Sequence, residues 1–194
     1  PGAVRPGAVV PLGGGGARGL SHIGVLRVLE REGFRIRAIA GTSMGGVIAA
    51  SYAAGFSPDE IEQRISRTAM SDLLRARPDG PSLIGLGRVE RFLRENLGDR
   101  TFADLRLPLA LTAVDLTAGK EIVLTEGRVV EAVMATIAIP GIFPPQLIGE
   151  GRLVDGGMMD PVPVMPARWL FPGPIAAAVG IGHLQLPPGH GQPE

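Results

Sequence analysis

The chain has 194 residues, of which 45% are hydrophobic and 20% charged, and its 19 basic residues balance 19 acidic ones. This composition is typical of one globular domain with a sizeable core, and the zero net charge gives no electrostatic case for nucleic-acid binding. Because the sequence has no cysteine, disulfides and thiolate metal sites are excluded, which suits a cytoplasmic protein. No segment has the uninterrupted apolar length of a membrane span, and since the sequence begins at Pro1, nothing follows from the lack of a signal peptide.

The first elements form a β-α-β unit. Hydrophobic patterning predicts, in order, a strand at 9–12, a glycine loop at 13–19, a helix at 20–32, a strand at 36–40 and a turn at 41–45. A right-handed crossover places both loops at the carboxyl ends of neighbouring parallel strands. Pro11 has no N–H to give to a sheet, so we expect the first strand to end near it.

The later elements are predicted from the same patterns. They are helices at 47–54, from 57–60 onward, at 88–97 and at 129–136, and strands at 109–114, 122–124, 152–154 and 175–179. Residues 70–87 are rich in glycine and proline and predict a mobile connection, while 137–145 predict an apolar loop. We expect one domain over 9–182, with flexible ends at 1–8 and 187–194.

The two glycine-built turns carry the chemistry. Residues 13–19 read Gly-Gly-Gly-Gly-Ala-Arg-Gly, and their bare N–H groups are the donors that an oxyanion needs. The same loop contains G-x-G-x-x-G at Gly14, Gly16 and Gly19, a dinucleotide-binding fingerprint, with Glu32 as the candidate ribose-binding acid.

The second turn, Gly41 to Gly45, matches G-x-S-x-G. This elbow presents a nucleophilic serine between a strand and a helix, so Ser43 is the candidate nucleophile. The alternative is that the Ser43 side chain only caps the following helix.

A serine hydroxyl needs a base. His22, in the first helix, is expected to be a packed or surface residue, and His190 to be solvated in the tail. His183 follows Asp155 and gives the Ser-Asp-His order of α/β-hydrolases. Asp155 itself, on the tight turn before Gly156-Gly157, is the candidate for a base that acts directly, because partial burial would raise its pKa. Asp115 is a rival that better fits a hairpin turn.

Together with Ala-Ile-Pro-Gly-Ile-Phe-Pro-Pro at 138–145 and Asp-Gly-Gly at 155–157, these motifs resemble the patatin-like phospholipase family from about residue 9 to about residue 182. The resemblance implies a three-layer α/β/α fold with a central, mostly parallel sheet. It implies a Ser-Asp dyad without histidine, in which Ser43 is the nucleophile and Asp155 the base. The residues that match the oxyanion loop are Gly14, Gly15, Gly16 and Arg18.

The resemblance also implies an activity, the hydrolysis of acyl esters of phospholipids or related lipids without a metal ion or other cofactor. The apolar segments 137–143 and 70–87 are then expected to line an acyl site or to touch a membrane surface. Asp160 departs from the family, which often has Asn there, and adds a second acid near the base. The chain is also short between the elbow helix and Leu109.

Three alternatives stay open from the sequence. One is a His-dependent esterase that uses Ser43, Asp155 and His183. Another is a nucleotide-binding module built on Gly14, Gly16 and Gly19, and the third is a non-catalytic lipid-binding relative. The sequence gives no indication of head group, acyl length or oligomeric state.

Overall fold

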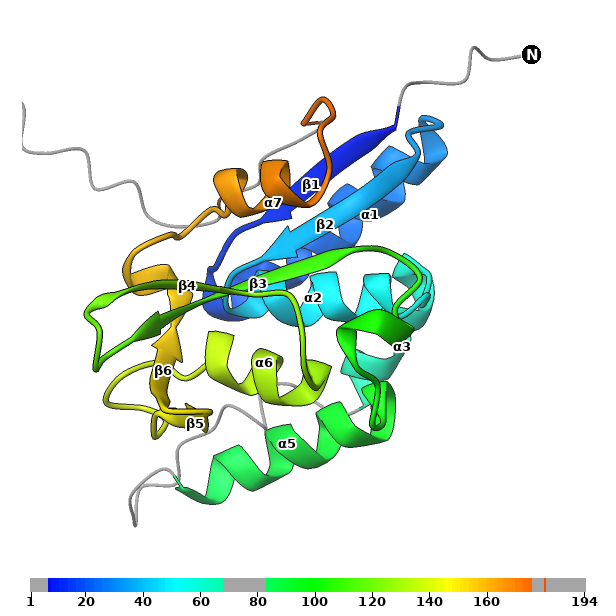
Figure 1. The fold of residues 1–194 in the computed structure, drawn as a ribbon. Coiled ribbons are helices and arrows are strands. Elements are labelled where there is room, and N and C mark those ends of the chain that lie inside the picture. The colour runs from blue at the N-terminus through cyan, green and yellow to red at the C-terminus, as the bar shows by residue number, and fades with distance from the viewer. Residues whose placement is uncertain (1–6, 68–82, 176–179, 181–194) are drawn as a thin grey trace, which may run out of the picture.

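The protein, as a computed structural model, has three layers (Figure 1) and is described for residues 7–67, 83–175 and 180. The strands are β1 (Ala8–Leu12), β2 (Ile36–Gly41), β3 (Leu109–Asp115), β4 (Lys120–Leu124), β5 (Gln146–Ile148) and β6 (Gly151–Asp155). The α-helices are α1 (His22–Arg31), α2 (Met44–Ala53), α3 (Pro58–Arg67), α5 (Leu83–Leu97), α6 (Val129–Thr136) and α7 (Val164–Leu170). Three 3₁₀ helices, η1 (Gly16–Ser21), η2 (Phe102–Asp104) and η3 (Gly156–Met158), join them.

One mixed sheet forms the middle layer, in the order β1-β2-β3-β6-β5, with β4 paired to β3 outside this path. The strands that lead into the predicted loops, β1 and β2, are parallel to each other and to β3, as expected for a β-α-β unit. The antiparallel pairs are β3 with β4, β3 with β6, and β5 with β6.

The register along β3 brings two strands end to end. Residues 113–115 pair with both β4 and β6, so these two strands lie on opposite edges of β3. Leu111 pairs with both β2 and β4, so β2 also lies on the edge away from β4. Strands β2 and β6 therefore share one edge of β3 and run toward each other, and their carboxyl ends meet there.

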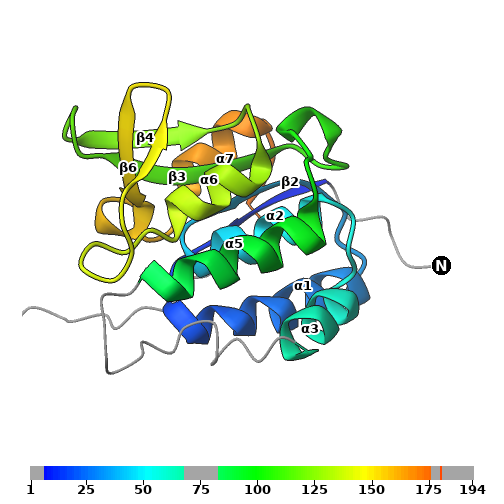
Figure 2. The same cartoon turned by 90° about the horizontal axis from the view of Figure 1, so that it is seen from below.

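The helices cover the two faces of the sheet unequally. Helix α7 packs on one face, against small side chains of β1, β2 and β3 such as Ala38, Ala40 and Ala110. On the other face, α2 and α6 contact the sheet and α1 contacts α2, and α3 and α5 lie outside these helices (Figure 2). The predicted three-layer α/β/α fold is thus confirmed.

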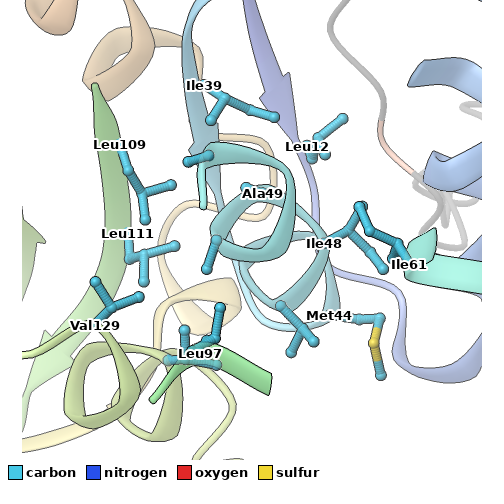
Figure 3. Packing of buried hydrophobic residues seen from close by; sticks show 14 of the residues in the cluster. Leu12, Ile39, Met44, Ile48, Ala49, Ile61, Leu97, Leu109, Leu111 and Val129 are labelled. Carbon is cyan, nitrogen blue, oxygen red and sulfur yellow. The ribbon is translucent and has the colours of Figure 1, made fainter. Parts of the chain in front are cut away.

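Helix α2 lies at the centre of the main core. Ile48 and Ala49 are fully buried among side chains of β1, β2, β3, α3, α5 and α6 (Figure 3). The small residues of α2 let it approach the sheet and α6 closely, because a Cβ at Gly46 would lie 3.2 Å from the Leu111 side chain of β3 and 2.7 Å from the Thr136 side chain of α6. The central helix therefore has little freedom to shift relative to the strands that it follows.

Several predicted boundaries were wrong. Helix α2 begins at Met44, directly after the serine, and α5 begins at Leu83, so residues 83–87 are helical and not part of a connection. The rest of the predicted connection lies outside the described residues. Helix α7 and strand β5 were not predicted, and Ala8 belongs to β1 and not to a flexible end.

Pro11 is the last residue but one of β1, opposite Ala40, so the strand ends next to it as expected. The N–H of Val9 donates to Pro174 on the side away from β2, and Pro11 faces the same side because it is two residues further along. Its missing N–H therefore removes no bond to β2. Of the predicted strand at 175–179, Ile175 forms a parallel bridge to Val9, and the other residues lie outside the described part.

Among the described residues, no helix has both the length and the apolar character needed to cross a bilayer. The prediction of one domain over 9–182 stays a prediction.

Candidate active site

Ser43 occupies the turn between β2 and α2 in a strained conformation. Its φ of 53° is the one positive φ of a non-glycine residue in the part of the chain that the structure describes. Such a backbone costs about 1–3 kcal/mol and is maintained only where the surroundings enforce it. Here the Ser43 N–H donates to Oγ1 of Thr136 at 2.9 Å, inside the core.

Two glycines make the elbow possible. A Cβ at Gly41 would lie 2.5 Å from the Cα of Gly46, and a Cβ at Gly45 would overlap the carbonyl oxygen of Leu12. The start of α2 therefore lies directly against the backbone at the ends of β1 and β2. This contact explains why the motif needs glycine on both sides of the serine.

The Ser43 hydroxyl donates to Oδ2 of Asp155 at 2.6 Å and makes no capping bond to α2. The alternative in which Ser43 only caps the helix is therefore wrong. The sheet register accounts for the contact, because Gly41 pairs with Leu111 and Asp155 with Ala113. The partner of Asp155 on β3 is therefore two residues beyond the partner of Gly41. Ser43 is likewise two residues beyond Gly41 in the sequence, so Ser43 and Asp155 reach the same level of β3.

Asp155 is buried, with 6% of its surface exposed. Burial raises the pKa of its carboxyl above the ordinary 3.8, and hydrogen bonds from Ser43 and from the Gly157 N–H act in the opposite direction. The Gly157 N–H reaches Oδ1 at 2.7 Å, so each carboxylate oxygen has one donor. This arrangement presents a carboxylate with increased proton affinity to the hydroxyl.

Threonine hydroxyls connect the two meeting strands. Oγ1 of Thr42 donates to the carbonyl oxygen of Asp160 at 3.0 Å and lies 2.7 Å from Oγ1 of Thr112, on β3. A Cβ at Gly156 would overlap Thr112, so the turn after Asp155 also packs against β3. Sequence analysis missed Thr112 and Thr136 because nothing local marks a buried threonine as a partner of a distant turn.

Asp160 is not among the groups that shift the pKa of Asp155. It interacts with Glu121 of β4, whose pKa is raised first by burial and then by the neighbouring Asp160 carboxylate. The influences on Asp155 come from burial, Ser43 and Gly157. The side chain of Asp115 instead accepts from the N–H of Thr117 at 2.8 Å in the β3–β4 turn, which confirms the predicted hairpin.

The members of the glycine loop differ in what they can donate. The Gly14 N–H donates to the carbonyl oxygen of Pro161 at 3.0 Å, so it is not available to a ligand in this structure. A Cβ at Gly14 would lie 3.3 Å from that of Ser43, so glycine is needed there for close approach. No acceptor bonds to the N–H of Gly15 or Gly16 within the described residues. Arg18 lies exposed in η1 and has no ion-pair partner in that same part of the chain.

Of the three histidines, the structure describes His22. It is fully buried, and its Nε2 lies 2.7 Å from the Gly13 carbonyl oxygen, whereas the serine hydroxyl bonds to Asp155. His183 and His190 lie outside the described residues. The direct bond between Ser43 and Asp155 favours the aspartate as the partner of the serine.

Glu32 is not placed where the ribose-binding acid of a dinucleotide fingerprint belongs. Glu32 follows the last residue of α1, a helix of 10 residues that begins beside the glycine loop, so it lies about 15 Å along the helix from that loop. A ribose-binding acid belongs instead at the carboxyl end of the next strand. Gly19 is needed for packing, since a Cβ there would lie 2.5 Å from the Met44 side chain. In the ranges 7–67, 83–175 and 180, no group of three or more potential ligands is placed to hold a metal ion.

An apolar cavity of about 50 Å³ opens beside Ser43. Its lining comes from the glycine loop, α2, α5 and the loop after α6, namely Gly16, Ser43, Met44, Val47, Val89, Phe92, Leu93, Ile137, Ile139 and Phe143. The predicted contribution of 137–143 to this wall is therefore seen, whereas residues 70–82 of the other predicted segment lie outside the described residues. None of these lining residues carries a charge.

Comparison with known proteins gives a consistent result. The model of the family described as patatin-like phospholipase matches residues 11–168. An uncharacterised NTE family protein of Mycobacterium tuberculosis is 37% identical over 168 residues, which cover 85% of this chain and 46% of that protein. A lysophospholipase of Candida glabrata is 31% identical over 163 residues, which cover 81% of this chain and 9% of that protein.

The crystal structure of VipD from Legionella pneumophila superposes with a TM-score of 0.62 at 15% identity, covering 81% of this chain and 47% of that chain. This likeness concerns the fold. The chain spans less than half the length of these curated relatives.

We predict that Thr136→Val lowers the free energy of unfolding by about 1–3 kcal/mol, because it leaves the buried Ser43 N–H without an acceptor while the side-chain shape is kept. Urea denaturation measures the change, and Thr125→Val, at an exposed position, is the matched control. Equal effects of the two substitutions would contradict the role assigned to the Thr136 hydroxyl.

Proposed function

The chain belongs to the patatin-like phospholipase family, and we propose that it hydrolyses acyl esters of phospholipids or related lipids through Ser43 and Asp155. The single observation that supports this mechanism most is the 2.6 Å hydrogen bond from the serine hydroxyl to a buried carboxylate. A nucleophile within hydrogen-bond reach of its base is the arrangement that covalent acyl transfer needs.

The reaction proceeds in two halves. Asp155 accepts the proton of the Ser43 hydroxyl as Oγ attacks the ester carbonyl, and the tetrahedral intermediate collapses when the leaving alcohol takes that proton. A water molecule then gives its proton to Asp155 and attacks the acyl-serine, and the proton returns to Ser43 as the fatty acid is released. No histidine takes part in this scheme.

The oxyanion is held by backbone donors of the glycine loop. Gly15 and Gly16 have N–H groups without an acceptor in the described structure, and Gly16 lines the cavity beside Ser43. Gly14 shapes the loop but offers no donor to the oxyanion, because its own N–H is bonded to Pro161. Arg18 contributes positive charge near the developing oxyanion, which stabilises the transition state more than the ground state.

The acyl group occupies the apolar cavity. Val89, Phe92 and Leu93 lie at the i, i+3 and i+4 spacing on one face of α5 and form one wall. A hydrocarbon chain gains from leaving water there, whereas a polar leaving group would find no hydrogen-bond partner on these side chains. The substrate is thus a lipid ester whose head group stays outside the cavity.

Peripheral contact with a lipid surface is part of the proposal. Met158 and Met159 follow the Asp155 turn and are 64% and 53% exposed, and exposed apolar side chains beside a lipid-cleaving site fit an interface with lipid. The cytoplasmic location stays a prediction.

We expect Ser43→Ala and Asp155→Asn each to lower kcat by several orders of magnitude with the fold intact, because one removes the nucleophile and the other the proton acceptor. Steady-state hydrolysis of a soluble p-nitrophenyl ester measures kcat, and labelling by a fluorophosphonate reports the nucleophile separately. His183→Ala is the matched control and keeps most of the activity. An inactive but folded His183→Ala enzyme would favour the His-dependent esterase.

The pH dependence should reflect the buried base. Because burial raises the Asp155 pKa, kcat/KM declines on the acid side at a pH above the ordinary 3.8. In the same pH window the folded state binds a proton more tightly than the unfolded state, so this group's contribution to stability is lost as pH rises. The activity profile of the wild type tests the first slope, and the unfolding profiles of wild type and Asp155→Asn test the second. An acid limb at or below pH 3.8 would contradict the assignment.

Filling the cavity should change acyl preference. We expect Val89→Phe to lower kcat/KM for octanoyl and longer esters by about tenfold or more while acetyl ester hydrolysis changes little, because overpacking displaces the longer chain. A series of p-nitrophenyl esters measures this, and Arg91→Phe introduces the same side chain at an exposed site of α5 as the control. A uniform loss across all chain lengths would place the acyl group elsewhere.

A further inference from the structure

His22 is a buried titratable residue that the proposed mechanism does not use. It is fully buried at the start of α1, and its Nε2 lies 2.7 Å from the carbonyl oxygen of Gly13. Because a carbonyl oxygen only accepts, Nε2 carries the hydrogen, and burial lowers the pKa of the ring so that the neutral form is favoured. The other ring nitrogen, Nδ1, has no hydrogen-bond partner within the described residues.

The Gly13–Gly14 peptide is consequently held at both ends. Its carbonyl oxygen accepts from His22, and its N–H, which points the opposite way in a trans peptide, donates to Pro161 at 3.0 Å. A rotation of this peptide plane would break both bonds. The first unit of the glycine loop is thus fixed by residues from two other segments of the chain.

A second peptide of the same loop is held on one side only. The Gly15 carbonyl oxygen accepts the Arg18 N–H at 3.2 Å, so the Gly16 N–H of that peptide points away from η1. Gly16 lines the cavity beside Ser43, and its φ of 55° is open to glycine but strained for other residues. The direction of this N–H therefore depends on how the preceding peptides are oriented.

We infer that His22 is a positioning residue for the oxyanion loop, in that its Nε2–H orients the Gly13 carbonyl and thereby aims the N–H groups of Gly15 and Gly16. This inference rests on the proposed function, because it assigns those N–H groups to the oxyanion. It also gives a reason for a polar ring in the core. A side chain that served packing alone would not bury an Nδ1 atom without a partner.

The matched pair of variants is His22→Gln and His22→Asn. Both replace the ring by a neutral amide, but the glutamine amide nitrogen lies where Nε2 lies in histidine, whereas the asparagine nitrogen ends at the level of Nδ1 and falls short of Gly13. We expect kcat for a soluble ester to stay within a few-fold of wild type in His22→Gln. In His22→Asn kcat falls on the order of 10- to 100-fold with KM nearly unchanged, since the loop contacts the transition state.

A second measurement follows the loop without the reaction. Amide hydrogen exchange at Gly14, observed by NMR, reports the bond to Pro161, and we expect it to accelerate about tenfold or more in His22→Asn but not in His22→Gln. Equal exchange in the two variants would overturn the clamp. Different exchange with equal kcat would overturn the positioning role.

The proposed function fails in a different way. If the wild-type enzyme shows no ester hydrolysis that depends on Ser43, the acyl-hydrolase assignment and the role of His22 in it are both wrong. The exchange measurement then still decides whether His22 holds the glycine loop. A decrease in kcat that is equal in His22→Asn and His22→Gln would show that any change of the ring disturbs the core.

Discussion

The site depends on one feature of the sheet, namely that β2 and β6 end against each other on the same edge of β3. The register sets Gly41 opposite Leu111 and Asp155 opposite Ala113, so only Thr112 separates the two paired stretches. Each strand leaves the sheet through a glycine-containing turn, and the turns must share the space above Thr112. The bond between Ser43 and Asp155 follows from this convergence, because neither residue could move along its strand without changing the pairing.

The burial of the base and the apolar wall beside the serine serve two different parts of the proposed reaction. Burial raises the proton affinity of the Asp155 carboxyl, whereas the wall offers a hydrocarbon chain a surface without hydrogen-bonding groups. Asp155 is not among the residues that line the cavity. Ser43 belongs to both, since its hydroxyl bonds to Asp155 and the residue lines the cavity.

The sequence was sufficient to predict the turns but not the partners that hold them. Motifs such as G-x-S-x-G and Asp-Gly-Gly are local, because glycine is needed where backbones meet. Thr136 is 93 positions from Ser43, and its role depends on a contact that no spacing reveals. Helix α7 was missed because Pro166 breaks the helical pattern, although proline is tolerated in a first turn, where no N–H is needed. The order and direction of β6 were likewise beyond local patterning.

The glycine loop combines flexibility in the unfolded chain with rigidity in the folded one. Four consecutive glycines lose more backbone entropy on folding than other residues would, and they bring no side chains to hold them in place. Their conformation must therefore be fixed from outside, by the Pro161 carbonyl, the His22 ring and the N–H of Arg18. None of these three partners lines the cavity, and the bonds leave the N–H groups of Gly15 and Gly16 without an acceptor in the described structure. Donors fixed in this way need no reorganisation when charge develops on a substrate, which is the condition for electrostatic catalysis.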